Sequence, residues 1–275
     1  MPPTEPLLPS QFPVAPFVPA PPLDDPAALR RHADALGYLF FRDLLPAGVV
    51  AELRAFVRGE CERLGWVEPE PDNPPVFRVR PGARLTGHGW DDPDWVALQR
   101  AVRLHPTFRA LAGCAEVRAV FAALWDEPPL LATANMSWVK LPGSPAQTTR
   151  PHQDRFYLRD VPRFWTLWVP LVDTPFEVGP LAVVRGSPAR GLVPHVDNLT
   201  GIAVPTDLPW DSAEVHPGDA VFFGELTVHC AWSNVSPTRV RASFDIRYEP
   251  QSAGPLTALH PAEFEGLVCV ANEGK

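Results

Sequence analysis

The sequence predicts an α+β fold in which helices come first and a β core follows. Apolar residues from Val49 to Leu64 recur with the 3.6-residue period of a helix, and further helical stretches are expected between residues 26 and 125. From about residue 130, short runs rich in Trp, Val, Leu and Phe alternate with Pro and Gly turns, a spacing typical of an antiparallel sandwich or barrel. Helices before strands is an α+β order. We therefore expect one domain over residues 27–275, preceded by a Pro-rich extension over residues 1–26.

The expected elements are marked by their end signals. Asp25-Pro26 is an N-cap followed by proline at the first helical position, and Gly37 is a plausible stop for this helix. The other expected helical regions are a helix from Pro46 to Gly65 and two or three stretches over 92–125, broken near Pro106 and Gly113. The expected strands are 38–41, 130–140, 165–172, 181–185, 219–224 and 239–248.

Composition narrows the function classes. The chain has a net charge of −8 and no cluster of Lys or Arg, which argues against a nucleic-acid or anionic-membrane surface. No run approaches the ~18 consecutive apolar residues of a membrane helix. The first residues lack the basic and apolar regions of a secretory signal. We expect a cytoplasmic protein, monomeric or weakly homo-oligomeric, that binds a small molecule.

Neither the Pro-rich start nor the cysteines are expected to carry chemistry. Residues 1–26 hold ten of the 36 prolines, so this segment should be extended or disordered. The four cysteines are widely spaced and form no CxxC motif, which gives little support to a zinc ribbon or a disulfide framework. Buried free thiols are the preferred interpretation for Cys61, Cys114, Cys230 and Cys269.

Three His-x-Asp pairs are candidates for part of a metal site. Two His and one carboxylate form a facial triad that leaves open positions on ferrous iron. The pairs are His32-Ala-Asp34, His152-Gln-Asp154 and His195-Val-Asp197. The first lies in a predicted helix, where residues two apart point to different faces. On a strand they share a face. We favour the second pair because Pro151 precedes it, as at the start of a strand, whereas the third has a loop-like setting.

The second histidine of a triad should come from a later strand, and His229 is the best candidate. It follows the turn Pro217-Gly218-Asp219 and a strand. A buried histidine hydrogen-bonded to the backbone is the alternative interpretation.

A row of charged residues follows His229. Residues 239–248 alternate polar and apolar, as a half-buried strand does. One face carries Arg239, Arg241, Ser243, Asp245 and Arg247. This face is either exposed to solvent, as is common in antiparallel sheets, or lines a barrel mouth. In the second case a guanidinium could bind a carboxylate with two parallel hydrogen bonds, and a nearby hydroxyl could add a third.

Together these motifs resemble the phytanoyl-CoA dioxygenase family of Fe(II)/2-oxoglutarate oxygenases over most of residues 27–250. Residues 36–39 resemble the family's N-terminal segment, and His152-Gln153-Asp154 resembles its HQD motif. The other matching pieces are Trp168 to Asp173, Gly179-Pro180-Leu181, Arg185-Gly186-Ser187, Pro217-Gly218-Asp219, His229, Asn234 and Arg241-Ala-Ser243. Each piece is modest, but their order and spacing together are specific.

The resemblance implies a double-stranded β-helix, a jelly-roll relative of the cupins, with the N-terminal helices packed on one sheet. It implies that His152, Asp154 and His229 hold Fe(II). It further implies that Arg241 and Ser243 bind the distal carboxylate of the co-substrate 2-oxoglutarate. Trp168 matches a family position close to that co-substrate.

The chain departs from the family pattern in two places. The family's arginine usually lies eleven residues after the distal His, where this chain has Val240. Arg241 is preferred for its RxS arrangement, and Arg239 stays open. The Gly-Ser motif is followed by Pro188 instead of His. Asp154 keeps the carboxylate that related halogenases usually lack, which argues against halogenation.

The expected reaction consumes O₂ and 2-oxoglutarate, releases succinate and CO₂, and oxidises a C–H bond of a small molecule, with hydroxylation in secondary metabolism preferred. Residues that flank the triad in sequence could contact the substrate, although ordinary packing explains them equally well. They are Trp138, Arg155, Tyr157 and Trp232. Lys140 could pair with a substrate acid, but an exposed lysine is commoner. The alternatives are a cupin-like metal enzyme that does not use 2-oxoglutarate and a non-catalytic β-sandwich binding module.

Overall fold

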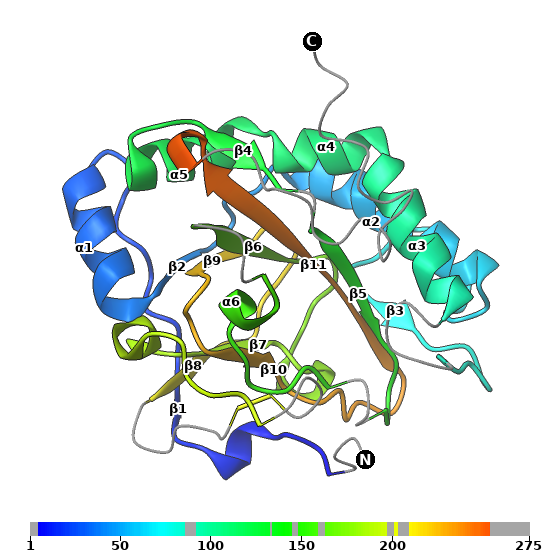
Figure 1. Ribbon diagram of the computed structural model, residues 1–275. Coiled ribbons are helices and arrows are strands. Elements are labelled where there is room, and N and C mark those ends of the chain that lie inside the picture. Colours follow the sequence, from blue (N-terminus) through cyan, green and yellow to red (C-terminus); the bar gives the residue numbers. More distant parts are fainter. Residues whose placement is uncertain are drawn as a thin grey trace.

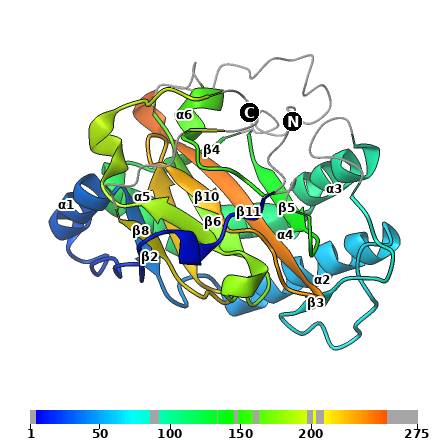
Figure 2. The ribbon, with the colours of Figure 1, turned by 90° about the horizontal axis from the view of Figure 1, so that it is seen from below.

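The protein folds into two facing β-sheets with helices over the outer face of the larger one (Figure 1). This computed structural model describes residues 5–85, 92–132, 134–144, 148–158, 163–196, 201–202 and 209–253. In the view from below, α2, α3 and α4 lie together on one side of the molecule and α1 lies on the other (Figure 2). The layering is that of a jelly roll with an N-terminal helical cover, as predicted.

The elements follow the predicted order of helices and then strands. The helices are α1 (Pro26–Leu36), α2 (Ala47–Arg63), α3 (Pro93–Leu104), α4 (Pro106–Ala112), α5 (Ala115–Trp125) and the short α6 (Asp154–Tyr157). The large sheet contains β2 (Tyr38–Phe41), β3 (Phe77–Arg78), β4 (Pro129–Leu131), β5 (Met136–Lys140), β6 (Trp165–Pro170), β9 (Ala220–Gly224) and β11 (Arg239–Pro250). The small sheet contains β1 (Val14–Ala15), β7 (Leu181–Val184), β8 (Trp210–Ser212) and β10 (His229–Ala231). Among the described residues, no helix has the length and apolar character needed to cross a bilayer.

The long strand β11 is the axis of the large sheet. It pairs with β6 along one edge, while β3, β5 and β4 pair with successive parts of its other edge. Beyond β6 the order continues through β9 to β2. Because β11 has neighbours on both edges, the side chains on its inner face are held in fixed positions between the two sheets.

Each face of the large sheet has its own core. On the outer face, Phe222 and Phe244 pack with helix residues such as Phe121, whose ring lies 5.5 Å from that of Phe222. On the inner face, Trp168 and Phe223 pack against apolar residues of the small sheet. The helices therefore cover the outer face, and the inner face is left for the site.

The ends of α1 match the sequence signals. Asp25 Oδ1 accepts a hydrogen bond from the backbone N–H of Ala28 at 2.9 Å, and Gly37 closes the helix with a φ of 85°. A Cβ at Gly37 would meet the ring of Pro188 at 2.7 Å, so glycine is required by conformation and by space.

The Pro-rich start is ordered over the described residues 5–26. This segment is extended, as expected, and β1 pairs in parallel with β8. Leu7 and Phe17 are buried, and Leu7 exchanges hydrogen bonds with Ser233. For these residues the alternative expectation of disorder was wrong, because the apolar side chains between the prolines bury themselves against the small sheet.

Several details differ from the sequence-based expectation. The run 130–140 forms two strands, β4 and β5, and the short strands β1, β3 and β8 were not predicted, whereas β10 is the later strand expected to carry His229. Strands of two or three residues are too short to show an alternating pattern. Cys61 and Cys230 are buried thiols, as expected, while Cys114 is half-buried and Cys269 lies outside the described residues.

Gly179, two residues before β7, provides a test of how closely this segment packs against Trp232, the residue after β10. Its φ is 84°, and a Cβ there would lie 2.2 Å from the carbonyl oxygen of Trp232. We expect Gly179→Ala to lower the free energy of unfolding by at least about 2 kcal/mol, measured by urea denaturation. Gly143→Ala is the matched control because Gly143 also has positive φ but has open space around it. Equal losses in the two variants would contradict this account.

Candidate metal centre

His152 and His229 face each other across an isolated antiparallel bridge. Each backbone N–H donates to the other residue's carbonyl oxygen, both at 3.0 Å. The two imidazole centroids are consequently only 4.2 Å apart. Two histidines from distant parts of the chain are thus held side by side, as the sequence predicts for a triad.

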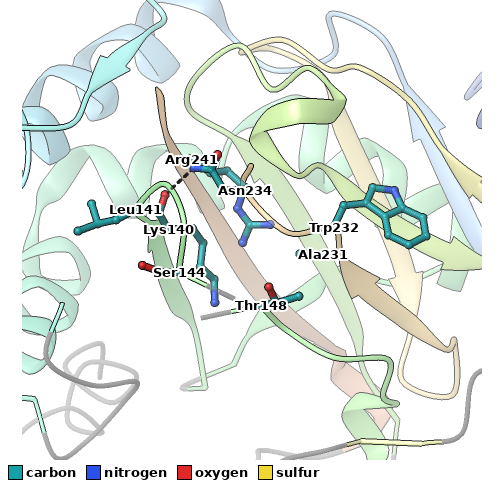
Figure 3. Close-up of a pocket in the computed structure, with 8 residues that line it drawn as sticks. All are labelled: Lys140, Leu141, Ser144, Thr148, Ala231, Trp232, Asn234 and Arg241. Atoms are coloured by element: carbon teal, nitrogen blue, oxygen red, sulfur yellow. Dashed lines mark hydrogen bonds between the residues drawn. The ribbon is translucent and has the colours of Figure 1, made fainter. Parts of the chain in front are cut away.

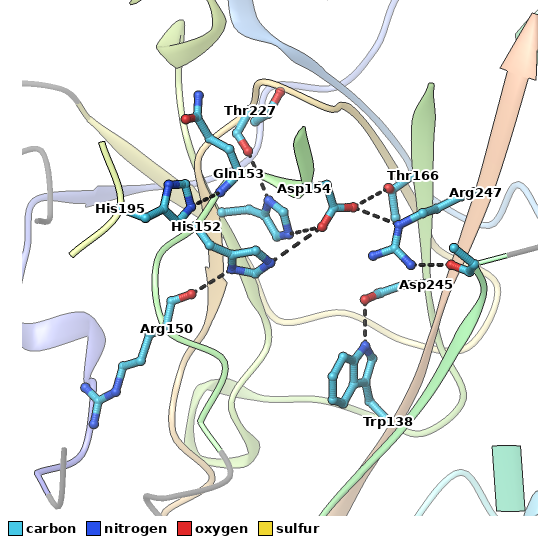
Figure 4. Close-up of polar contacts among 12 residues, drawn as sticks. Trp138, Arg150, His152, Gln153, Asp154, Thr166, His195, Thr227, Asp245 and Arg247 are labelled. Carbon is cyan, nitrogen blue, oxygen red and sulfur yellow. Dashed lines mark hydrogen bonds and ion pairs between the residues drawn. The ribbon is translucent and has the colours of Figure 1, made fainter. Parts of the chain in front are cut away.

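Asp154 completes the group. Its Oδ1 lies 3.6 Å from His152 Nε2 and 3.7 Å from His229 Nε2 (Figure 4). One ligand atom from each of the three residues lies within 4.8 Å of the others, and all three residues are buried. Among the described residues, these three are the His, Cys or carboxylate side chains that lie close enough together to hold a metal ion.

The local backbone at the motif differs from the prediction. His152 is in the bridge, but Asp154 is the first residue of α6 and not a strand residue. The i, i+2 argument for a strand was therefore wrong, since the chain turns into a helix between the two ligands. Gln153 holds this turn: its side chain is buried, its amide donates to the carbonyls of Gly191 and Leu226, and its oxygen accepts from Val193 N–H.

The backbone also sets the orientation of each imidazole. His152 Nδ1 lies 2.7 Å from the carbonyl oxygen of Arg150, and His229 Nδ1 lies 3.0 Å from that of Thr227. A carbonyl oxygen can only accept, so Nδ1 carries the proton in both rings. The lone pairs are then on Nε2, the atoms that face Asp154, which is the usual arrangement of metal-binding histidines.

The protonation states of His229 and Asp154 suit the binding of a metal cation. Burial, together with the nearby His152, lowers the pKa of His229 to about 3, so its imidazole is neutral near pH 7. Burial alone would raise the pKa of Asp154, but the guanidinium of Arg247 and the two histidines hold that pKa well below its usual range. Two imidazoles and one carboxylate are the donor set of the facial triad, and this set fits ferrous iron.

The other two His-x-Asp pairs are not metal sites in the described structure. His32 and Asp34 lie in α1, as expected. His195 stacks on Phe156 of α6 at 3.8 Å between ring centroids, and it accepts a hydrogen bond from Gln153 N–H. Asp197 lies outside the described residues. His195 therefore packs against the segment that contains the favoured motif, His152-Gln153-Asp154.

A pocket lies along β11. Its lining includes Lys140 on β5 and Arg241 on β11, which are directly opposite in the strand register (Figure 3). Arg241 Nη1 donates to the carbonyl of Gly179 at 3.0 Å, but its Nε and the hydroxyl of Ser243 are buried and have no hydrogen-bond partner. The other lining residues are Leu141, Ser144, Thr148, Ala231, Trp232 and Asn234.

The pocket is cationic. Arg241 is 2% and Lys140 7% exposed, so the expectation that Lys140 is an ordinary exposed lysine was wrong. Burial and the neighbouring Arg241 hold the pKa of Lys140 well below its usual value, while burial lowers the pKa of Arg241 to about 10. Two adjacent buried basic side chains, one of them with an unpartnered Nε at Arg241, fit an anionic ligand such as a carboxylate, and the unpartnered hydroxyl of Ser243 follows two residues later on the same strand.

Arg239, the alternative arginine, is held elsewhere. Its Nη2 donates to the carbonyl of Asp173 at 2.8 Å, and its Nη1 lies 3.9 Å from Glu177. It is not among the residues that line the pocket. The structure therefore favours Arg241, as the RxS arrangement does.

Of the other expected site residues, Trp138 and Tyr157 lie near the centre. Trp138 Nε1 donates to Asp245 at 2.6 Å, and Lys140 Nζ lies 4.4 Å above the indole ring. Tyr157 is 47% exposed, and its ring lies 5.5 Å from that of His152.

Three other expected residues pack in the surroundings of the centre. Trp168 lies in the core between the sheets. Arg155 forms an ion pair with Glu225 at 2.8 Å. The ring of Trp232 points away from Lys140 and Arg241 (Figure 3), and its Nε1 donates to Ser212. Ordinary packing thus accounts for Trp232.

Two residues that contact the centre were given no site role from the sequence. Thr166 and Arg247 both donate to Asp154 Oδ2. Alternation along β11 did place Arg247 on the correct face. Thr166 is the one hydroxyl-bearing residue in the run Trp165–Pro170, and a single polar residue in an apolar strand could have indicated a buried hydrogen-bonding role.

Comparison with known proteins identifies the family. Residues 33–243, most of the chain, match the family model described as phytanoyl-CoA dioxygenase. The chain belongs to this family. As a phytanoyl-CoA dioxygenase family member with the His152, Asp154 and His229 triad in place, it is a non-haem iron oxygenase that depends on 2-oxoglutarate.

The chain is also similar to two hydroxylases from Streptomyces and to solved structures of an epimerase from nogalamycin biosynthesis. The 1-deoxypentalenic acid 11-beta-hydroxylases of Streptomyces arenae and Streptomyces exfoliatus are 29% and 28% identical to the chain, and each match covers 84% of this chain and 83% of the relative. The non-haem α-ketoglutarate-dependent epimerase SnoN from nogalamycin biosynthesis is 25% identical, with a TM-score of 0.55 over 82% of this chain and 84% of that one. A SnoN complex with Fe³⁺, α-ketoglutarate and nogalamycin RO has a TM-score of 0.61 at 23% identity, over 91% and 93% of the two chains, and shows the shared fold.

Lys140→Met tests the cationic pocket. The change removes a buried charge next to Arg241, so we expect the free protein to gain about 1 kcal/mol of stability and a melting temperature about 2–4 °C higher. We expect 2-oxoglutarate to bind about tenfold more weakly to the Mn(II)-loaded variant. Differential scanning fluorimetry and calorimetric titration measure the two effects. Arg239→Met is the control and should leave 2-oxoglutarate affinity unchanged. A less stable Lys140→Met with unchanged affinity would contradict the assignment.

Proposed function

We propose that the chain hydroxylates a C–H bond of a small, largely apolar natural-product scaffold, consuming 2-oxoglutarate and O₂ and releasing succinate and CO₂. The observation that carries this proposal is that the His152, Asp154 and His229 cluster and the cationic pocket of Arg241 and Lys140 meet on β10, where His229 belongs to the cluster and Ala231 lines the pocket. A metal cluster alone would suit many cupin-like enzymes. The adjacent pocket for an acid is what favours 2-oxoglutarate.

We assign the metal ligands as Nε2 of His152, one oxygen of Asp154 and Nε2 of His229. The backbone hydrogen bonds at Nδ1 keep both imidazoles in the tautomer that binds a metal. The bound iron, together with 2-oxoglutarate and O₂, supplies the oxidation itself. The protein holds and orients these groups.

The distal carboxylate of 2-oxoglutarate is assigned to Arg241 and Ser243. The unpartnered Arg241 Nε and Ser243 hydroxyl can both donate to it. Lys140 contributes a second positive charge from the opposite strand. Binding of a dicarboxylate would offset the cost of burying these two cations.

Apolar side chains around the triad keep bulk water away from the reacting centre. The ring of Phe223 lies 4.3 Å from that of His229, and Trp168 belongs to the same core between the sheets. Three large apolar or aromatic residues remain exposed, namely Tyr157, Leu192 and Val196. Tyr157 lies against His152, and an exposed aromatic ring beside the triad favours an apolar substrate.

The substrate class is inferred from the relatives. The curated relatives at 28–29% identity are hydroxylases of 1-deoxypentalenic acid, whereas SnoN is an epimerase from nogalamycin biosynthesis. Proteins similar to this chain thus catalyse different reactions, hydroxylation in one case and epimerisation in the other. We favour hydroxylation because the hydroxylases match the sequence of this chain at higher identity than SnoN does.

The alternatives predict different chemistry. A cupin-like isomerase or zinc-dependent hydrolase would not release succinate, and a binding module would not require a metal. Iron-dependent formation of succinate from 2-oxoglutarate separates the proposed function from both alternatives, and the metal content of the protein separates the alternatives from each other. A cytoplasmic location and a monomeric or weakly homo-oligomeric state stay predictions of the sequence.

His152→Ala tests the function. Removal of one ligand should reduce oxygen uptake coupled to 2-oxoglutarate by at least about 100-fold, measured with an oxygen electrode and by succinate release. His216→Ala is the matched control, because His216 is exposed and paired with Asp173 at the surface. Retention of coupled oxygen uptake in His152→Ala would show that the assignment is wrong.

A further inference from the structure

The two oxygens of Asp154 have different surroundings. Oδ1 faces the Nε2 atoms of His152 and His229. Oδ2 points the other way and accepts a hydrogen bond from Thr166 Oγ1 at 2.8 Å and one from Arg247 Nε at 3.0 Å (Figure 4). One oxygen is thus directed at the metal position, and the other is held by the sheet.

The two donors come from the centre of the large sheet. Thr166 on β6 and Arg247 on β11 are direct cross-strand partners, and both strands are central in the large sheet. Both side chains are buried. Asp154, in contrast, is the first residue of the four-residue helix α6. The sheet therefore fixes a ligand whose own element is too short to do so.

Arg247 is itself held firmly. Its Nη1 donates to the carbonyl oxygen of Ala134, and its backbone N–H donates to Asn135 Oδ1 at 2.8 Å. Asp154 and Asp245 together balance its buried charge. The guanidinium therefore has little freedom to leave Asp154 Oδ2.

We propose that Thr166 and Arg247 are positioning residues that restrict Asp154 to binding the metal through Oδ1 alone. A carboxylate can bind a metal through one oxygen or both. The facial triad leaves three metal positions, of which 2-oxoglutarate takes two and O₂ one. Binding through both Asp154 oxygens would occupy one of these three. The clamp formed by Thr166 and Arg247 keeps that position open for the co-substrate. This inference rests on the proposed function.

Thr166→Val is the first test, because it removes one donor to Oδ2 with little change of shape or charge. Without the clamp, Asp154 loses some pre-organisation but gains access to a second metal contact, and these effects oppose each other. We expect Mn(II) affinity without 2-oxoglutarate to change by less than about fivefold. We expect 2-oxoglutarate affinity of the Mn(II)-loaded variant to fall by about 10–100-fold. Electron paramagnetic resonance of free Mn(II) and calorimetric titration measure the two affinities.

Arg247→Lys is the second variant, since it keeps the positive charge but loses the planar guanidinium that reaches both Asp154 and Ala134. It should show the same split between metal and 2-oxoglutarate affinity. Thr174→Val and Arg58→Lys are matched controls. Thr174 is a buried threonine that donates to a backbone carbonyl at 2.8 Å, and Arg58 is a buried arginine that donates to the carbonyls of Pro74 and Val76; none of these contacts involves Asp154 or Arg247. Both controls should keep the wild-type affinities.

The outcomes separate the alternatives. A parallel loss of Mn(II) and 2-oxoglutarate affinity would mean that the clamp merely keeps Asp154 in place, and would overturn the proposal. Unchanged affinities with a lower melting temperature would assign Thr166 and Arg247 to stability alone. If the Mn(II)-loaded wild type itself does not bind 2-oxoglutarate, the proposed function fails, and this inference fails with it.

Discussion

The site depends on the pair of backbone hydrogen bonds between His152 and His229. These two bonds join the segment before α6 to β10, and each residue satisfies the other's N–H and C=O. Residues that exchange both hydrogen bonds in an antiparallel pair are held directly opposite each other. The imidazoles are therefore adjacent before any metal binds. Asp154 follows His152 by two residues, so the same bridge also places Asp154 near the two imidazoles.

Charge is the second constraint on the interior. The inner face of β11 places Arg241, Asp245 and Arg247 in a row between the sheets. Near the triad the charges are balanced, because Arg247 lies between Asp154 and Asp245. At the other end, Arg241 lies beside Lys140, and the acidic side chain of Asp245 acts on both. We propose that an anionic co-substrate bound beside these two basic groups stabilises them, which would link the stability of the protein to ligand binding.

Much of this arrangement was predictable from the sequence, and the exceptions have physical causes. Alternation along residues 239–248 placed Arg241, Ser243 and Arg247 on one face, and the HQD motif with His229 gave the triad. The helical start at Asp154 was missed, because strand and helix place residues two apart differently and the motif alone does not choose between them. The burial of Lys140 depends on its partner strand, a tertiary effect that local pattern does not encode. The order of the Pro-rich start likewise depends on the small sheet, against which Leu7 and Phe17 pack.

The central claim is that three side chains hold iron beside an arginine that binds 2-oxoglutarate. The most direct measurement is the anomalous diffraction of crystals grown without oxygen in the presence of Fe(II) and 2-oxoglutarate. The account predicts an iron peak bonded to Nε2 of His152, Nε2 of His229 and a single oxygen of Asp154, with the distal carboxylate on Arg241. Iron at another position, or a distal carboxylate away from Arg241, would contradict it.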